Sequence, residues 1–260
     1  MSQSDSEGKP HRGVYLLPSL FTTGALFAGF YAMIQALQGD FTTAAIAILI
    51  AMVLDGLDGR VARMTNSQSD FGAEYDSLSD MVSFGVAPAL IVYEWSLGNA
   101  GEFAAQWGKL GWLAAFIYVA CAALRLARFN TQLGKTDKRF FQGLASPSAA
   151  AVMVGMVWFS RDLGVAGSDL VVLAFAVTVA TGLLMVTSIP YYSFKDLGSG
   201  RRVPFIATLA VVMVFVFTSI DPPKVIFGGF VLYALSGPVW WLYRHSRRRG
   251  RRPSTSGDGV

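Results

Sequence analysis

The sequence predicts an all-α membrane protein, a bundle of about eight transmembrane helices with both termini on one side. Its composition is the first reason. Of the 260 residues, 53% are hydrophobic and 15% are charged, whereas an ordinary soluble domain has roughly 45–50% apolar and about 25% charged residues. The second reason is the recurrence of long apolar runs, and the third is an uneven distribution of lysine and arginine between the connecting segments.

The apolar runs have about the 17–25 residues that a helix needs to cross a bilayer. They lie near 17–37, 42–64, 71–96, 109–131, 147–161, 168–190, 203–219 and 225–243. The first 13 residues are polar and no cleavage site follows the first run, so we expect this segment to stay in the protein. The expected divisions are a cytoplasmic N-terminal segment (1–13), a membrane catalytic domain (14–243) and a basic disordered cytoplasmic tail (244–260).

The basic residues test this arrangement. If the N-terminus is cytoplasmic, all 21 lysines and arginines except Lys109, Arg161 and Lys224 fall on the cytoplasmic side, as the positive-inside rule requires. An odd number of spans would destroy this asymmetry. The six arginines of the tail contribute more positive charge than the net charge of +4, so the rest of the chain is slightly acidic. The basic character belongs to the tail, and we expect no nucleic-acid partner. The tail either anchors the last helix or contacts anionic lipid.

Several kinds of catalytic site are excluded by composition. Cys121 is the only cysteine, which rules out an internal disulfide and a cysteine-based zinc site. The two histidines, His11 and His245, lie near the termini, which disfavours a Ser-His-Asp triad and a histidine-ligated metal. Acid–base chemistry therefore falls to carboxylates.

Four aspartates near the cytoplasmic ends of the second and third spans stand out from the apolar background. On helices, Asp55 and Asp58 share one face, and Gly72, Asp76 and Asp80 share another. Each ionisable residue within a membrane helix costs about 2.5–3.5 kcal/mol, so four unpaired carboxylates cost on the order of 10 kcal/mol. A ligand or partner must offset this cost.

Divalent cations would do so, because clustered carboxylate oxygens suit Mg²⁺ or Mn²⁺. Small neighbouring residues leave room for a bulky anionic group, to which Arg63 and Ser69 could donate hydrogen bonds. One alternative is that the aspartates pair with arginines and only hold the bundle together. Another is a cation transporter, which is disfavoured because the acids cluster at one edge of two helices beside arginines.

The motif D-x2-D-G-x2-A-R-x8-G-x3-D-x3-D carries a resemblance. It resembles the signature of the CDP-alcohol phosphatidyltransferase family, and every specified position matches. Its residues here are Asp55, Asp58, Gly59, Ala62, Arg63, Gly72, Asp76 and Asp80. The resemblance implies a membrane enzyme with a six-helix core, usually homodimeric, in which a hydroxyl displaces CMP from a CDP-linked lipid with the help of two Mg²⁺ or Mn²⁺ ions.

The resemblance also implies roles for single residues. Asp55 and Asp76 would bridge both metals, Asp58 would complete the first site, and Asp80 would hold the second metal and accept the proton of the acceptor hydroxyl. The residues expected to contact the CDP-lipid are Pro18, Ser19, Gly59, Arg63 and Ser69.

Three further segments, 83–88 (SFGVAP), 124–130 (LRLARFN) and 141–150 (FQGLASPSAA), resemble bacterial and archaeal phosphatidylserine synthases. This likeness covers roughly residues 14–155 and implies CDP-diacylglycerol and L-serine as substrates, at the cytoplasmic face of a bacterial inner membrane. The sequence departs from the pattern at Pro18-Ser19, where Pro-Asn is usual, and at Ala145, where proline is common.

Arginines near the end of the fourth span are the candidates for acceptor recognition. Arg125 and Arg128 share a helix face, Asn130 follows, and a guanidinium fork matches the carboxylate of serine. The alternatives are that these arginines bind lipid phosphates or anchor the helix end. Glycerol 3-phosphate or an inositol phosphate would also attract arginines, so charge alone leaves the acceptor open.

Overall fold

The computed structural model describes residues 16–65, 67, 69–98, 104–132, 140–192, 213 and 216–249. Within these ranges the chain is nearly all helical, which confirms the predicted all-α membrane bundle. Its helices are α1 (Leu16–Leu37), α2 (Phe41–Met64), α3 (Asp70–Asp80), η2 (Met81–Val86), α4 (Ala87–Val92), η3 (Tyr93–Leu97), α5 (Ala104–Gln132), α6 (Ser146–Asp162), η5 (Gly167–Leu170), α7 (Val171–Val186) and α9 (Pro222–Arg249). Two short strands, β1 (Phe140–Gln142) and β2 (Pro190–Tyr192), form one antiparallel pair.

Within the part of the chain that the structure describes, five helices are long and apolar enough to cross a membrane, so the protein is an integral membrane protein. They are Pro18–Leu37, Phe41–Met64, Lys109–Thr131, Gly167–Val186 and Pro222–Tyr243, and each coincides with an expected span. The expected span 71–96 is the continuous helical stretch from α3 to η3, and 147–161 is α6. The expected span 203–219 lies largely outside the described residues, as do the N-terminal segment and the end of the tail.

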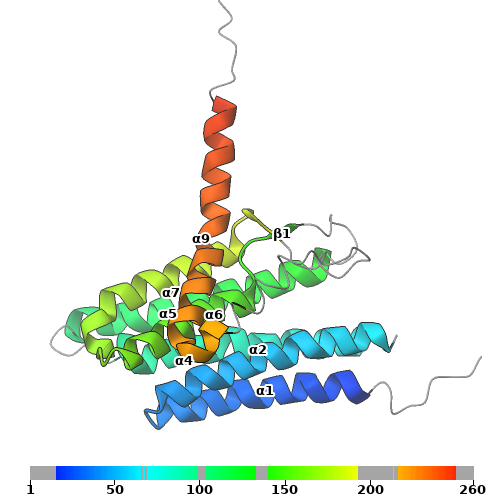
Figure 1. Ribbon diagram of the computed structural model, residues 1–260, viewed down its shortest axis with the longest axis horizontal. Coiled ribbons are helices and arrows are strands. Elements are labelled where there is room, and N and C mark those ends of the chain that lie inside the picture. The colour runs from blue at the N-terminus through cyan, green and yellow to red at the C-terminus, as the bar shows by residue number, and fades with distance from the viewer. Residues whose placement is uncertain are drawn as a thin grey trace, which may run out of the picture.

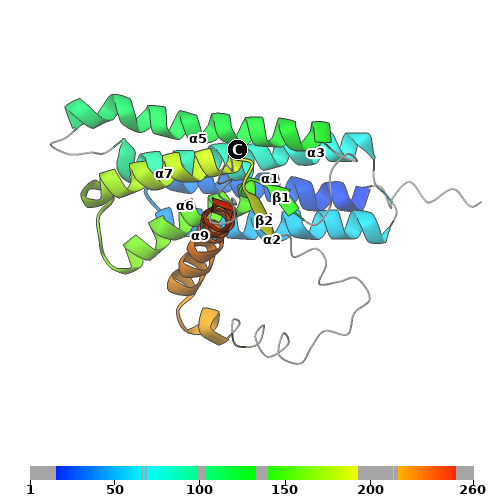
Figure 2. The same ribbon diagram turned by 90° about the horizontal axis from the view of Figure 1, so that it is seen from above.

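Helices α1, α2, α5 and α7 run roughly parallel to one another, with α1 against α2 and α5 against α7, while α9 crosses them steeply and its C-terminal half extends away from the bundle (Figures 1 and 2). Helices α1 and α2 pack against each other and both carry buried alanines, which allow two backbones to approach closely. The buried alanines are Ala25, Ala28, Ala32, Ala36, Ala44, Ala45, Ala47 and Ala51.

The third helical stretch changes from α-helix to π-helix directly after Asp80. A π-turn frees a backbone carbonyl from the regular ladder, and here the fully buried Tyr118 hydroxyl donates to the Phe84 carbonyl at 3.0 Å. Ser83 Oγ donates to the Ala25 carbonyl at 3.1 Å. A Cβ on Gly29 would lie 2.5 Å from Ser83 Oγ, so α1 and η2 pack at a distance that only glycine permits.

The segment before α6 is fixed against the end of α7. Gly143 has a φ of +81°, and a Cβ there would lie 2.2 Å from the Met185 carbonyl oxygen, so both conformation and space require glycine. The Gly143 N–H donates to the Ile189 carbonyl at 2.9 Å, and the Leu144 N–H donates to the Leu184 carbonyl at 3.0 Å. These bonds place the first residue of α6, Ser146, beside α5.

Candidate active site

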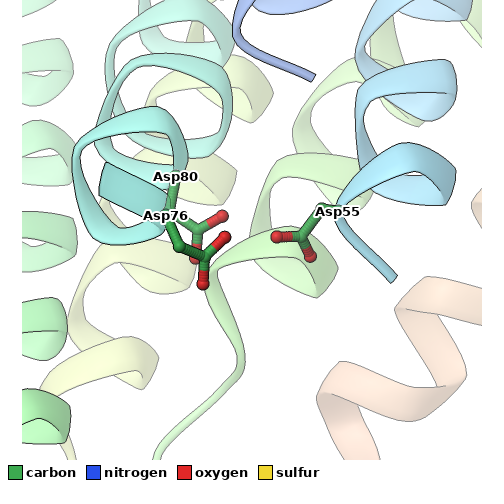
Figure 3. A group of neighbouring side chains, drawn as sticks. All are labelled: Asp55, Asp76 and Asp80. Atoms are coloured by element: carbon green, nitrogen blue, oxygen red, sulfur yellow. The ribbon is translucent and has the colours of Figure 1, made fainter. Parts of the chain in front are cut away.

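Two helix ends bring the aspartates together. Asp55 lies near the C-terminal end of α2, and Asp76 and Asp80 project from one face of α3 toward it (Figure 3). Each offers a carboxylate oxygen, and the three oxygens lie within 4.8 Å of one another. The start of α3 is defined by Ser69, whose hydroxyl accepts a hydrogen bond from the Gly72 N–H at 3.0 Å, a typical N-cap.

Asp58 lies beside this group but not within it. The residue is 6% exposed, and its carboxylate accepts a hydrogen bond from Thr22 Oγ1 at 2.8 Å. It interacts electrostatically with Asp55 and Asp76. Thr22 was not among the residues that the sequence singled out, because nothing in α1 indicates that this threonine faces a carboxylate 36 residues later.

The donor set fits a divalent cation. Asp76 Oδ1 is buried and has no hydrogen-bond partner, which is costly unless a ligand compensates. Among the described side chains, no lysine or arginine nitrogen lies within 4.0 Å of the four carboxylates. The alternative that the four aspartates form ion pairs with arginines of the bundle is therefore not supported for the described side chains. An all-oxygen cluster with an orphaned carboxylate oxygen is the kind of site that Mg²⁺ or Mn²⁺ occupies.

Arg125 approaches the cluster from α5. Its guanidinium donates to Ser146 Oγ at 2.7 Å, and its charge acts on Asp80 and Asp55 without forming an ion pair. The positive charge therefore lies near the carboxylates while leaving them free for another ligand. Ser146 is held in place by the glycine turn before α6.

The other two residues expected at the acceptor site already have protein partners. Arg128 donates to the Gln142 side chain on β1 and, at 3.4 Å, to the Val186 carbonyl. The Asn130 amide donates to Ser77 Oγ at 3.0 Å. Ser77 lies between Asp76 and Asp80 in sequence, so Asn130 ties the end of α5 to the acidic helix.

The residues expected to contact the CDP-lipid come from α1, from α2 and from the cap of α3. Gly59 and Arg63 are exposed, and a Cβ on Gly56 or Gly59 would meet nothing within 4 Å. This surface of α2 is open to a bulky group. At the start of α1, the Pro18 carbonyl accepts from Thr22 Oγ1 at 3.1 Å and the Ser19 carbonyl accepts from Thr23 Oγ1 at 2.6 Å.

Comparison with known proteins gives the site a context. The profile of the CDP-alcohol phosphatidyltransferase family matches residues 15–227. A Helicobacter pylori (strain ATCC 700392 / 26695) protein named CDP-diacylglycerol–serine O-phosphatidyltransferase is 34% identical over 234 residues, which are 90% of this chain and 94% of that protein.

Proteins of the same name from two other organisms are also similar to this chain. One from Mycobacterium bovis is 40% identical over 194 residues, which are 70% of this chain and 64% of that protein. One from Methanocaldococcus jannaschii is 40% identical over 149 residues, which are 57% of this chain and 63% of that protein. The region that the family profile matches, residues 15–227, contains all four aspartates of the site. The chain therefore belongs to the CDP-alcohol phosphatidyltransferase family and is a membrane transferase.

Proposed function

We propose that this protein transfers the phosphatidyl group of CDP-diacylglycerol to the hydroxyl of L-serine, giving phosphatidylserine and CMP. The observation that carries the proposal is the convergence of Asp55, Asp76 and Asp80, whose oxygens lie within 4.8 Å of one another. The names of the relatives, one of them aligned with 90% of this chain, support serine as the acceptor.

The cluster would hold two Mg²⁺ or Mn²⁺ ions. Asp55 and Asp76 would bridge both, Asp58 would complete the first site and Asp80 the second. When bound, the ions neutralise the charge of the pyrophosphate and of the departing CMP. The orphaned Asp76 Oδ1 supports this assignment, because a cation would satisfy an oxygen that no described donor reaches.

The reaction is a displacement at phosphorus. The serine oxygen forms a bond to the phosphorus that carries the diacylglycerol, the bond from this phosphorus to the bridging oxygen breaks, and CMP leaves with the electron pair. Asp80 accepts the hydroxyl proton, since a carboxylate within reach of the acceptor is the available general base. The exposed strip of α2 around Gly59 and Arg63 would receive the cytidine diphosphate.

Arg125 is the best candidate for the serine carboxylate. Its guanidinium interacts electrostatically with Asp80 and Asp55, and a charge-assisted hydrogen bond to a carboxylate is stronger than a neutral one. Arg128 and Asn130 would support the same pocket through β1 and α3. Glycerol 3-phosphate and an inositol phosphate are the alternative acceptors with the same chemistry.

The direct test is CMP release from CDP-diacylglycerol by the purified chain, with and without L-serine. We expect release to require serine and to stop in EDTA. Glycerol 3-phosphate, an inositol phosphate and ethanolamine are tested in place of serine as comparison acceptors. Turnover with another acceptor in place of serine would assign a different alcohol, and undiminished turnover in metal-free buffer would exclude the two-metal site.

We further propose that the termini and the site face the cytoplasm of a bacterial cell, and that the protein is a homodimer. Cys121 is buried, so introduced cysteines can report on orientation. In intact cells, an impermeant maleimide should label Ser168→Cys but should label Met64→Cys only after lysis. Light scattering of the detergent-solubilised protein, corrected for detergent, should give twice the chain mass.

A further inference from the structure

Thr22 lies where α1 meets both acidic helices. Its hydroxyl is within 2.8 Å of Asp58 Oδ2 and within 3.1 Å of the Pro18 carbonyl. The residue is 4% exposed and Asp58 is 6% exposed. A hydroxyl has one proton to donate, and a buried carboxylate is the stronger acceptor of the two.

The backbone of the same residue contacts α3. Ser79 Oγ donates to the Thr22 carbonyl at 3.1 Å, and Ser79 precedes Asp80 in the chain. One turn further along α1, Ser83 makes the equivalent bond to the Ala25 carbonyl at 3.1 Å. The two serines fix the position of α1 relative to the helical stretch formed by α3 and η2. With α1 in this position, the Thr22 hydroxyl contacts the Asp58 carboxylate on α2.

We propose that Thr22 is a positioning residue that orients the Asp58 carboxylate for cation binding. This bond to Oδ2 restricts rotation of the carboxylate, which also interacts with Asp55 and Asp76 of the cluster. Partners of this kind orient metal ligands, and their loss typically costs about 10–100-fold in metal affinity. The inference rests on the proposed function, because it assumes that the aspartate cluster binds a divalent cation.

A threonine with a purely structural role provides the comparison. Thr178 on α7 is fully buried, and its hydroxyl donates to the Ala174 carbonyl of its own helix at 2.7 Å. Many buried threonines in helices bond in this way. Thr22 Oγ1 is also within reach of a carbonyl of its own helix, that of Pro18, but its single proton has a nearer and charged acceptor in Asp58, so its role exceeds that of packing.

The test is titration of the purified, metal-free full chain with Mn²⁺, with free Mn²⁺ measured by electron paramagnetic resonance. Thr22→Val keeps the shape but removes the donor, Thr22→Ser restores the donor, and Thr178→Val is the matched control. We expect Thr22→Val to bind Mn²⁺ about 10–100-fold more weakly, with Thr22→Ser and Thr178→Val close to the parent. The Mn²⁺ concentration for half-maximal CMP release should rise in Thr22→Val by a similar factor.

Equal Mn²⁺ affinity in Thr22→Val and the parent would overturn the inference and leave the proposed function intact. A Thr22→Ser variant as weak as Thr22→Val would also overturn it, because the hydroxyl would then not be the cause. A parent that binds no Mn²⁺ would remove the cation site and the inference together. If Thr22→Val does not elute as a folded protein, Thr22→Ala, which adds no atoms, replaces it.

Discussion

The two ends of α2 carry aspartates in opposite circumstances. Asp40 precedes the helix, is exposed, and accepts a hydrogen bond from the Thr43 N–H at 3.1 Å. Hydrogen bonds from Thr43 hold the pKa of Asp40 below its usual value of 3.8. At the other end, Asp55 and Asp58 are largely removed from solvent and face the carboxylates of α3. One carboxylate stabilises a helix end, and the others are costly until a ligand binds.

The largest expected effect follows from removing an acidic ligand. Asp55→Ala or Asp76→Ala should reduce CMP release on the order of 10³-fold or more, since metal-assisted charge neutralisation supplies several kcal/mol. The unfolding temperature in EDTA should not fall, because the variant removes one of several mutually repelling carboxylates. Activity and thermal unfolding, measured in parallel, check this. Substantial turnover, or a large loss of stability in EDTA, would make these residues structural.

The next largest effect distinguishes the role of Asp80 as general base from the role of the aspartates as metal ligands. Asp80→Asn should lower turnover by about 10²–10⁴-fold, because an amide cannot accept the serine proton. Mn²⁺ binding should largely persist, since the amide oxygen can still ligate and the other three aspartates are intact. A single-turnover assay at saturating Mn²⁺ measures the chemical step. Near-parental turnover would assign the base elsewhere.

A smaller effect is expected from replacing Arg125, the positively charged side chain beside the aspartate cluster. Arg125→Leu should raise the KM for L-serine by about 10-fold or more and that for CDP-diacylglycerol much less, because losing a charge-assisted hydrogen bond costs about 1.5–3 kcal/mol. Arg128→Leu is the matched variant, with a smaller expected effect because its guanidinium already contacts Gln142. Ethanolamine, which lacks the carboxylate, should be a poor acceptor for the parent.

The opposite result for the arginines is equally informative. If both leucine variants lose affinity for CDP-diacylglycerol while the KM for serine is unchanged, these arginines hold the phosphates of the donor. The serine carboxylate would then be bound elsewhere on the cytoplasmic side. The next candidates are Lys135, Lys138 and Arg139, which lie outside the described residues.

The smallest effect belongs to the other end of α2. Asp40→Ala should lower the free energy of unfolding by about 1 kcal/mol, as loss of an N-cap does, and should leave the kinetic constants unchanged. Because the pKa is lowered in the folded protein, the contribution is present at neutral pH and is lost as the pH falls through that lowered pKa. Unfolding of the parent and variant at pH 7 and below pH 3 measures it. A kinetic defect at neutral pH would mean that the two ends of α2 are coupled.

Periodicity and spacing were enough to predict the long helices among the described residues and the convergence of the two acidic helix faces, of which Asp55, Asp76 and Asp80 form the closest group. An apolar run long enough to cross a bilayer indicates a transmembrane helix, and i, i+4 spacing places residues on one face of a helix. The contacts of Thr22 and Asn130 were not predictable, because each depends on how two helices distant in sequence are set against each other. The π-turn after Asp80 was not predictable either, because the residues around it have no sequence pattern that favours it, and the contact that accompanies it, from Tyr118 to the Phe84 carbonyl, joins helices distant in sequence.

Helix α6 has a consequence for how the chain is made. It has 17 residues, and every residue from Ala149 to Val157 is buried by neighbouring helices. One neighbour, α2, is synthesised earlier, but Gly155 and Phe159 pack on Phe227 of α9, which emerges from the ribosome much later. During synthesis α6 therefore enters the bilayer with one flank uncovered. The translocon or lipid must shelter that flank until the last helix arrives.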